Sequence, residues 1–189
     1  MDALWWIVIA VAALIVLALI AWAVARKRRS SQLHDRFGPE YERTVEQADS
    51  RRDAERELRE REQRHEDLDI RPLPDAARRR YADEWQRVQA RFVDDPEGAV
   101  GEADRLVRQV LDDRGYPSED DWEQRAADVS VDYPEVVENY REGHGLWHRY
   151  RSSEGEGKGD TEDLRQAMTR FRRLFDELLE GERVEEEVR

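Results

Sequence analysis

An uncharged apolar run near the N-terminus restricts the possible folds of this chain more than any other feature. It extends from Ala3 to Ala25 and reads ALWWIVIAVAALIVLALIAWAVA. At a rise of 1.5 Å per residue, a helix over this run would be about 34 Å long, and the hydrocarbon core of a bilayer is about 30 Å thick. Trp5, Trp6 and Trp22 lie near its two ends, where indole rings favour the membrane interface. The run therefore predicts a single N-terminal transmembrane helix.

Four basic residues follow this run directly, namely Arg26, Lys27, Arg28 and Arg29. No Lys or Arg precedes the run, so the positive-inside rule predicts an outside N-terminus and a cytoplasmic C-terminal domain. The same cations would bind anionic membrane lipid at about 1 kcal/mol each. We therefore expect residues 1–29 to form a transmembrane anchor with a basic stop, in a single-pass protein of the cell membrane.

Two alternatives to this topology stay open. In the first alternative, the apolar run is a secretory signal that is cleaved off. In the second, the helical domain faces outward or is secreted. The sequence AVA at 23–25 is compatible with cleavage, but signals begin with basic residues and have shorter apolar runs, whereas this chain begins with Asp2. A retained anchor is therefore the preferred interpretation.

The remainder of the chain is unusually polar. Lys and Arg number 32 against 45 Asp and Glu, the formal net charge is -13, and charged residues make up 41% of the chain. An ordinary globular domain has roughly 25%. The acidic balance argues against a nucleic-acid partner, because polyanion binding requires clustered cations. The absence of cysteine excludes disulfides and cysteine-bound metals.

Residues 30–73 are expected to form a charged helical neck or spacer. A narrow apolar stripe with a spacing of four comprises Leu33, Phe37, Tyr41 and Val45. A helix is expected to begin near Pro39, since proline is best tolerated in a first helical turn. From 50 to 67 the sequence is mostly Arg, Glu and Asp, with Leu58 as its main apolar residue, and pairs such as Glu55–Arg59 support an exposed helix. This stretch is typical of a solvated arm.

Residues 74–180 are expected to form a small bundle of four or five helices, which makes the fold class all-α. Each expected helix carries apolar residues at spacings of three and four. The first stripe comprises Ala77, Tyr81, Trp85, Val88 and Phe92. The second comprises Ala99, Val100, Ala103, Leu106, Val107, Val110 and Leu111. A short third stripe comprises Trp122, Ala126 and Val129, and a fourth comprises Val136, Val137, Tyr140, His144 and Trp147. The last helix, from about Thr161, carries Leu164, Ala167, Met168, Phe171, Leu174, Phe175, Leu178 and Leu179. Residues 152–160 are interpreted as a linker, and 181–189 as an acidic tail.

Local signals mark the ends of these helices. In VDDP, Asp95 is expected to be an N-cap with Pro96 as the first helical residue, and Asp94 adds negative charge near the helix N-terminus. This explains both carboxylates without a substrate, so we favour a helix–helix corner over a catalytic or metal-binding pair. Gly115 fits a left-handed position after a helix. Ser118 is expected to cap the next helix, with Asp120 and Asp121 in its first turn.

His144 and His148 are the strongest candidates for a metal site. They lie four apart and share one helical face, which is the spacing with which two histidines bind a divalent metal. The zinc-hydrolase pattern requires a glutamate directly after the first histidine, and Gly145 occupies that position. Glu142 or Glu138 could act as a third ligand, but no pattern brings them there. Histidines that line an aromatic face are the preferred interpretation, and metal binding is kept as an alternative function.

No catalytic constellation is recognised in the sequence. GEGKGDT at 155–161 lacks the spacing of a phosphate-binding loop, and neither a G-x-S-x-G elbow nor a dinucleotide fingerprint is present. We therefore expect a non-enzymatic protein without a cofactor. A thin bundle that leaves an aromatic stripe exposed would serve as a protein-interaction or scaffold module, which binds a protein partner or self-associates.

Three segments of the chain resemble a known group of proteins. They are 33–74, 80–117 and 163–179, and contain the strings FGPEYERTVEQAD, DDPEGAVGEADRLV and FRRLFDELL. They resemble small proteins of high-GC bacteria that have an N-terminal membrane segment and are described as membrane or secreted proteins of unknown function. The resemblance implies a bacterial, membrane-anchored, helical protein. It implies no activity, substrate or catalytic residue.

Overall fold

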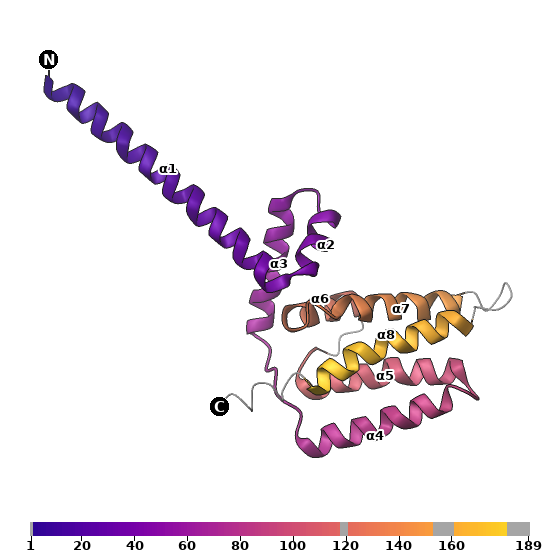
Figure 1. The fold of residues 1–189 in the computed structure, drawn as a ribbon. Coiled ribbons are helices and arrows are strands. Elements are labelled where there is room, and N and C mark those ends of the chain that lie inside the picture. The colour runs from indigo at the N-terminus through magenta and orange to yellow at the C-terminus, as the bar shows by residue number, and fades with distance from the viewer. Residues whose placement is uncertain (1, 118–120, 153–160, 181–189) are drawn as a thin grey trace. The chain divides into compact units, whose positions relative to one another are not determined.

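The structure is a computed structural model that describes residues 2–117, 121–152 and 161–180, apart from the side chains of 2–13, 22, 23, 25 and 26. Every regular element in these ranges is an α-helix (Figure 1). The helices are α1 (Asp2–Phe37), α2 (Pro39–Gln47), α3 (Arg51–Glu66), α4 (Asp75–Arg91), α5 (Pro96–Arg114), α6 (Trp122–Asp132), α7 (Val137–Ser152) and α8 (Thr161–Glu180). The chain divides into two compact units, Met1–Arg59 and Glu60–Arg189. Residues 153–160 of the expected linker at 152–160, the expected tail at 181–189 and Ser118 lie outside the described residues. Ser152 is the last residue of α7.

The predicted transmembrane component of the fold is contradicted by the structure. Among the residues that the structure describes, no helix combines the length and the apolar character that a membrane crossing requires. The predicted anchor over 1–29, the single-pass topology and the localisation that followed from it are therefore corrected. The side chains of Trp5, Trp6, Trp22 and Arg26, on which that prediction also drew, lie outside the described set.

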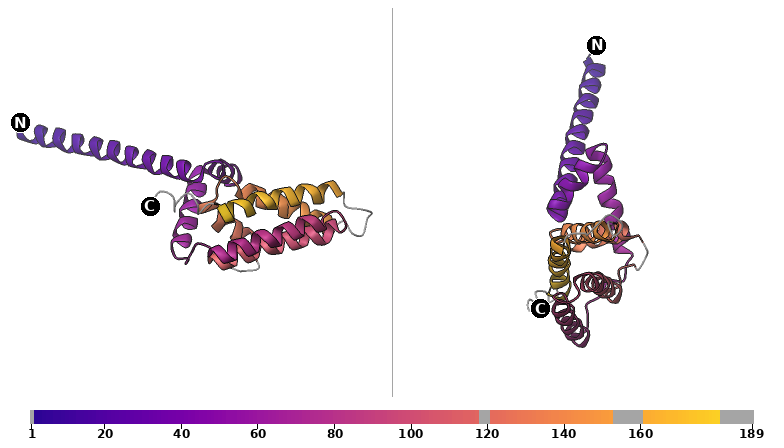
Figure 2. Two further views of the ribbon diagram at one scale, coloured as in Figure 1. Left: turned by 60° about the horizontal axis from the view of Figure 1, so that its bottom comes forward. Right: turned by 90° about the vertical axis from the view of Figure 1, so that its right-hand side faces the viewer.

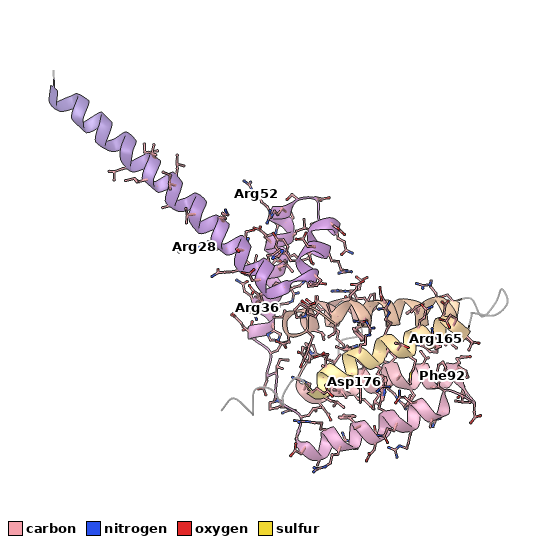
Figure 3. All side chains as sticks on the ribbon, viewed as in Figure 1. Arg28, Arg36, Arg52, Phe92, Arg165 and Asp176 are labelled. Atoms are coloured by element: carbon pink, nitrogen blue, oxygen red, sulfur yellow. The ribbon has the colours of Figure 1, made fainter. Side chains whose placement is uncertain are left out.

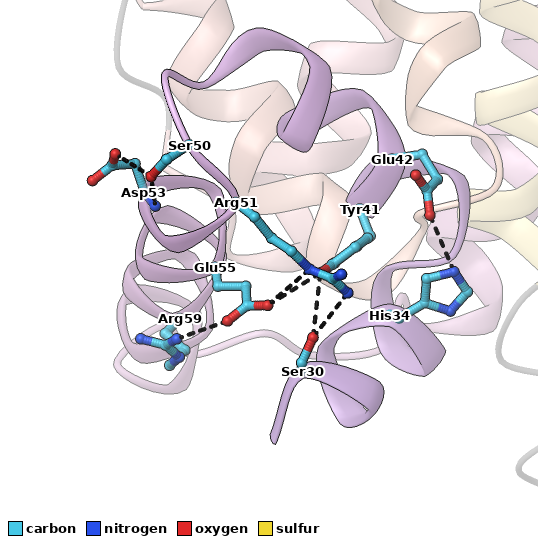
Figure 4. A network of polar contacts seen from close by, with 9 residues as sticks. All are labelled: Ser30, His34, Tyr41, Glu42, Ser50, Arg51, Asp53, Glu55 and Arg59. Atoms are coloured by element: carbon cyan, nitrogen blue, oxygen red, sulfur yellow. Dashed lines mark hydrogen bonds and ion pairs between the residues drawn. The ribbon is translucent and has the colours of Figure 1, made fainter. Parts of the chain in front are cut away.

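A polar network connects the helices of the first unit (Figure 4). The Arg51 guanidinium donates to the Tyr41 hydroxyl over 2.8 Å and to the Ser30 hydroxyl over 3.0 Å, which joins α3 to α2 and α1. Tyr41 in turn donates to the Glu55 carboxylate over 3.2 Å. Burial acts to raise the pKa of Glu55, but hydrogen bonds from Ser30 and Tyr41 and the charges of Arg51 and Arg59 hold this pKa below its ordinary value.

The buried face of α3 differs from the solvated arm expected for residues 50–67. Ala54 and Leu58 are fully buried, and Arg61 is only 6% exposed. These residues lie four and three positions apart, so they share one face of the helix. The expected Glu55–Arg59 ion pair is present, with 3.5 Å between nitrogen and oxygen. Most residues of α3 are charged, and this composition suggested a fully solvated helix. Ala54 and Leu58 nevertheless form a narrow face that packs against other parts of the protein.

The second unit is a helical bundle whose packing order differs from its chain order (Figures 1 and 2). Helix α5 contacts α4, α8 and α7, and α7 also contacts α6 and α8. The last helix is therefore inserted between α5 and α7. Every apolar residue predicted for the inner face of α8 is buried, and so is every one predicted for α5. Charged side chains such as Arg165 are exposed on the outer faces (Figure 3).

Two of the three expected helix ends are confirmed in this unit. Asp95 caps α5, because its Oδ1 accepts a hydrogen bond from the Gly98 amide over 3.0 Å, and Pro96 begins the helix. Gly115 ends α5 in the left-handed region with φ of 98°. The expected cap of α6 is corrected: Asp121 accepts from the two amides that follow Trp122, so it is itself the N-cap.

Candidate functional site: an arginine–tryptophan cleft

The two candidate histidines line a cleft that is formed by α5, α6 and α7. Its volume is about 370 Å³, within the range of about 300–1,000 Å³ that is usual for ligand sites. Its lining residues are Asp104, Arg105, Arg108, Gln109, Asp112, Trp122, Arg125, Tyr140, His144, Trp147, His148 and Arg151. We call this site the arginine–tryptophan cleft, because these two residue types dominate its walls.

The α5 wall of the cleft is built from residues one helical turn apart. Arg108 donates to the Asp104 carboxylate over 2.9 Å, and this i, i+4 pair places both side chains on one face of α5. Arg105 lies beside them and donates to Glu102 over 3.3 Å. The opposite face of the same helix is apolar and packs into the core, so the polar face is directed toward the cleft.

Stacked aromatic rings form the walls that α6 and α7 contribute. The Trp122 indole lies nearly parallel to the His144 imidazole, with ring centroids 4.3 Å apart and planes inclined by 20°. Trp147 stacks on Tyr150, and the Arg151 guanidinium carbon lies 5.8 Å from the centroid of the Trp147 ring. These contacts hold the planar side chains in place before a ligand arrives.

A glycine allows Trp147 to approach α5 closely. A Cβ atom at Gly101 would lie 3.2 Å from Cζ2 of the Trp147 indole, which is tighter than an ordinary van der Waals contact. The absence of a side chain at Gly101 therefore allows the Trp147 indole to approach α5 closely.

The cleft has an excess of positive charge, although the chain as a whole has a formal net charge of -13. Its cations are Arg105, Arg108, Arg125 and Arg151, and its acids are Asp104 and Asp112. At physiological ionic strength, charges farther away than about 8 Å are largely screened, so the local excess decides which small charged groups are attracted. The lining residues therefore carry a formal excess of positive charge, which Glu102 reduces through its ion pair with Arg105.

His144 is held toward its neutral form. Burial lowers the pKa of His144 from its ordinary value of 6.5, and the nearby charges of His148, Arg108 and Arg125 lower it further, against the opposing effect of Asp104. At neutral pH, His144 therefore adds little positive charge to the cleft, and the arginines of its lining carry positive charge there.

Two buried polar atoms at the cleft have no hydrogen-bond partner among the described residues. They are Oδ1 of Asp104 and the hydroxyl oxygen of Tyr140. Tyr140 is fully buried and Asp104 is 6% exposed. Burial also raises the pKa of Tyr140, with a further contribution from the charge of Asp104.

The structure brings the predicted His144 and His148 side chains together, but not into a larger ligand set. Their ring centroids are 5.0 Å apart. Within the described ranges, no group of three or more histidine, aspartate or glutamate side chains is placed to hold a metal ion. One face of His144 is also covered by Trp122. The stacking of His144 on Trp122 is the contact that the aromatic-face interpretation predicts, and metal binding by the two histidines stays a prediction.

The other residues that the sequence singled out lie elsewhere. Asp94 and Asp95 lie at the corner between α4 and α5, where Asp95 acts as a cap. Lys27, Arg28 and Arg29 are exposed on α1, and the Arg26 side chain lies outside the described set.

Sequence reasoning missed most of the cleft. The sequence singled out His144 and His148 and placed three aromatic lining residues on apolar stripes, but it missed the arginines and acids of the cleft. For these, the i, i+4 pairing of Asp104 with Arg108 is a local signal, and in sequence it is indistinguishable from the many exposed ion pairs of this chain. A second polar cluster also escaped notice, in which Asp132 accepts from the Tyr116 hydroxyl and lies 2.6 Å from Nε2 of His65.

No family model matches this chain, and neither a curated protein nor a solved structure matches it. The resemblance to small proteins of high-GC bacteria therefore stays a prediction. The function is inferred below from the geometry of the cleft.

Proposed function

We propose that this chain is a non-enzymatic protein-interaction module whose helical bundle binds a protein partner at the arginine–tryptophan cleft. The observation that carries the proposal is the convergence of four arginines and two tryptophans from three helices on one cleft of an acidic chain. Arginine, tryptophan and tyrosine are the residues that dominate binding hot spots in protein interfaces. A cleft of about 370 Å³ would accept the anchoring side chains of a partner, rather than a whole helix.

Preorganisation of the aromatic walls supports the proposal. Trp122 and Trp147 are each stacked on a neighbouring ring, so a partner that binds here would lose less free energy in ordering these side chains. Arginine side chains at the rim would then select the charge of the partner and accelerate the encounter.

In-cell photocrosslinking tests the proposal. A photoreactive amino acid at position 148, an exposed position on the rim of the cleft, is compared with the same amino acid at Thr169, an exposed position on α8. We expect one discrete adduct from position 148 that is absent from position 169. An adduct of twice the chain mass would identify the partner as a second copy.

The charge of the cleft provides the second arm of the experiment. The double substitution Arg105→Glu with Arg151→Glu should abolish the adduct from position 148, since both arginines are exposed and line the cleft. No adduct from position 148, equal adducts from both positions, or an adduct that survives the charge reversal would overturn the proposal.

A further inference from the structure

We propose that Asp104 and Tyr140, which we call the floor of the cleft, bind an uncharged group that both donates and accepts hydrogen bonds. The protein partner supplies this group as an amide or hydroxyl side chain. The inference rests on the proposed function and names the chemistry of the anchoring side chain. It draws on one acceptor and one donor that are buried at the cleft without a partner, and on the charges around them.

The acceptor is Oδ1 of Asp104 on α5. The Asp104 carboxylate lines the cleft and accepts a hydrogen bond from Arg108 over 2.9 Å, but it does so through Oδ2. Oδ1 is buried and accepts from no described residue. A carboxylate oxygen that is buried without a donor costs free energy, because it has lost its hydrogen bonds to water. A ligand that places an N–H or O–H group against Oδ1 would remove this cost.

The donor is the hydroxyl group of Tyr140 on α7, which lines the same cleft. Burial raises the pKa of Tyr140 and outweighs the opposing effect of the neighbouring Arg125, so the hydroxyl carries its proton at neutral pH. Arginine has no acceptor, so Arg125 cannot receive this proton. The hydroxyl therefore has a hydrogen-bond donor to offer to a ligand.

The acceptor and the donor are neighbours that do not bond to each other. Apart from burial, the charge of Asp104 has the largest effect on the pKa of Tyr140 and on that of His144. Electrostatic effects weaken with distance, so the carboxylate lies near both α7 residues. A single group between Asp104 and Tyr140 could therefore engage both. Because both atoms are buried, it reaches them when a long lining side chain such as Arg108, which is 45% exposed, turns aside.

The charges around the floor disfavour a charged ligand group. A carboxylate or a phosphate dianion has no donor for Oδ1 of Asp104 and would bring negative charge next to it. An ammonium or guanidinium group has no acceptor for the Tyr140 hydroxyl. It would also lie beside Arg108 and Arg125, whose charges both act on this hydroxyl. An amide or a hydroxyl group offers a donor and an acceptor without charge.

The test uses the purified full chain and small aromatic probes of similar size. Benzamide and benzyl alcohol carry an uncharged donor–acceptor group, whereas benzoate lacks a donor, benzamidine lacks an acceptor and toluene lacks both. Affinities are measured by NMR titration of the indole N–H resonances of Trp122 and Trp147, which line the cleft. We expect benzamide, benzyl alcohol or both to bind on the order of tenfold more tightly than each of the other three. The tighter of the two identifies the anchoring side chain as an amide or a hydroxyl.

Matched substitutions locate the binding group. Tyr140→Phe removes the hydroxyl and keeps the ring, so the affinity for the preferred probe should fall several-fold while that for toluene stays the same. Tyr150→Phe makes the same change on the same helix, outside the cleft lining, and should leave both affinities unchanged. Asp104→Asn replaces an acceptor-only carboxylate by an amide that can donate, so the preference for benzamide over benzoate should shrink.

Several outcomes would overturn the inference. If no probe binds, the two buried atoms are satisfied within the protein or by water. If benzoate, benzamidine or toluene binds as tightly as the uncharged polar probes, the floor does not select a donor–acceptor group. Equal losses in Tyr140→Phe and Tyr150→Phe would contradict a role of the Tyr140 hydroxyl. The inference and the proposed function can fail separately: a crosslinked partner without selectivity among the probes overturns only the inference. Selective probe binding without a crosslinked partner overturns the function and leaves the chemistry of the floor in place.

Discussion

The indole ring of Trp85 stacks on the phenyl ring of Phe175, with ring centroids 4.4 Å apart and planes inclined by 18°. Both side chains are almost fully buried. The contact joins α4 to α8, two helices that are far apart in the sequence. The bundle that carries the cleft therefore depends on an aromatic pair outside it.

Replacement of Trp85 by alanine should destabilise the bundle strongly. Removal of a buried tryptophan costs about 3–5 kcal/mol, through lost transfer free energy and the cavity that remains. Val93→Ala is the control, since Val93 is 83% exposed and should change the free energy of unfolding by less than about 0.5 kcal/mol. Denaturant-induced unfolding measures both. If both variants change the free energy of unfolding by a similar amount, the Trp85–Phe175 contact does not contribute to the stability of the bundle.

Two glycines on one helix should respond to alanine with opposite signs. A Cβ atom at Gly143 would lie 3.0 Å from the Phe171 ring, and overpacking of this kind typically costs about 1–3 kcal/mol. At Gly145 the nearest such atom is the flexible end of Arg149 at 3.7 Å, so Gly145→Ala should stabilise the helix by about 0.5–1 kcal/mol. Thermal unfolding of both variants checks this. Stabilisation by both would mean that Phe171 relaxes without cost.

The adjacent carboxylates at the α4–α5 corner should differ in their contribution to stability. Asp95→Ala removes the side chain that accepts from the Gly98 amide, and loss of such a cap costs about 0.5–2 kcal/mol. Asp94 is exposed and does not cap the helix, so Asp94→Ala should cost only a few tenths of a kcal/mol. The free energy of unfolding of each variant decides the matter. A larger effect at Asp94 would reopen a functional role for the pair.

Protonation of His144 at low pH should lower the free energy of unfolding of the bundle. Burial and the neighbouring His148, Arg108 and Arg125 lower the pKa of His144 in the folded state, so the unfolded chain binds its proton more readily. Its contribution to stability is present above pH 6.5, the ordinary value, and is lost as the pH falls through the lowered folded-state pKa.

A pH series of unfolding curves tests this expectation. The decline in unfolding free energy below pH 6.5 should be smaller in His144→Gln than in the native sequence. His34→Gln serves as the control, because His34 is exposed and lies on α1, outside the unit that contains His144. If the His144 variant declines as steeply as the native chain, the acid sensitivity must arise elsewhere.

Local features of the fold could be predicted from the sequence because they depend on near neighbours along the chain. The apolar residues of α5 and α8, the cap at Asp95 and the left-handed Gly115 follow from spacings of three and four and from the chemistry of single residues. Composition, in contrast, misled the interpretation of α3. Its charges indicated a solvated arm, although Ala54 and Leu58 are enough to bury one face.

The arginine–tryptophan cleft was decided by the tertiary structure alone. Its residues come from three stretches of α5, α6 and α7, and they meet because these helices pack against one another and against α8 in an order that differs from their order in the chain. The sequence by itself determined which residues form helices and which face of each is apolar, since helical periodicity is a local property. It could not determine which helix contacts which, because every apolar stripe in this chain is chemically able to pack against any other.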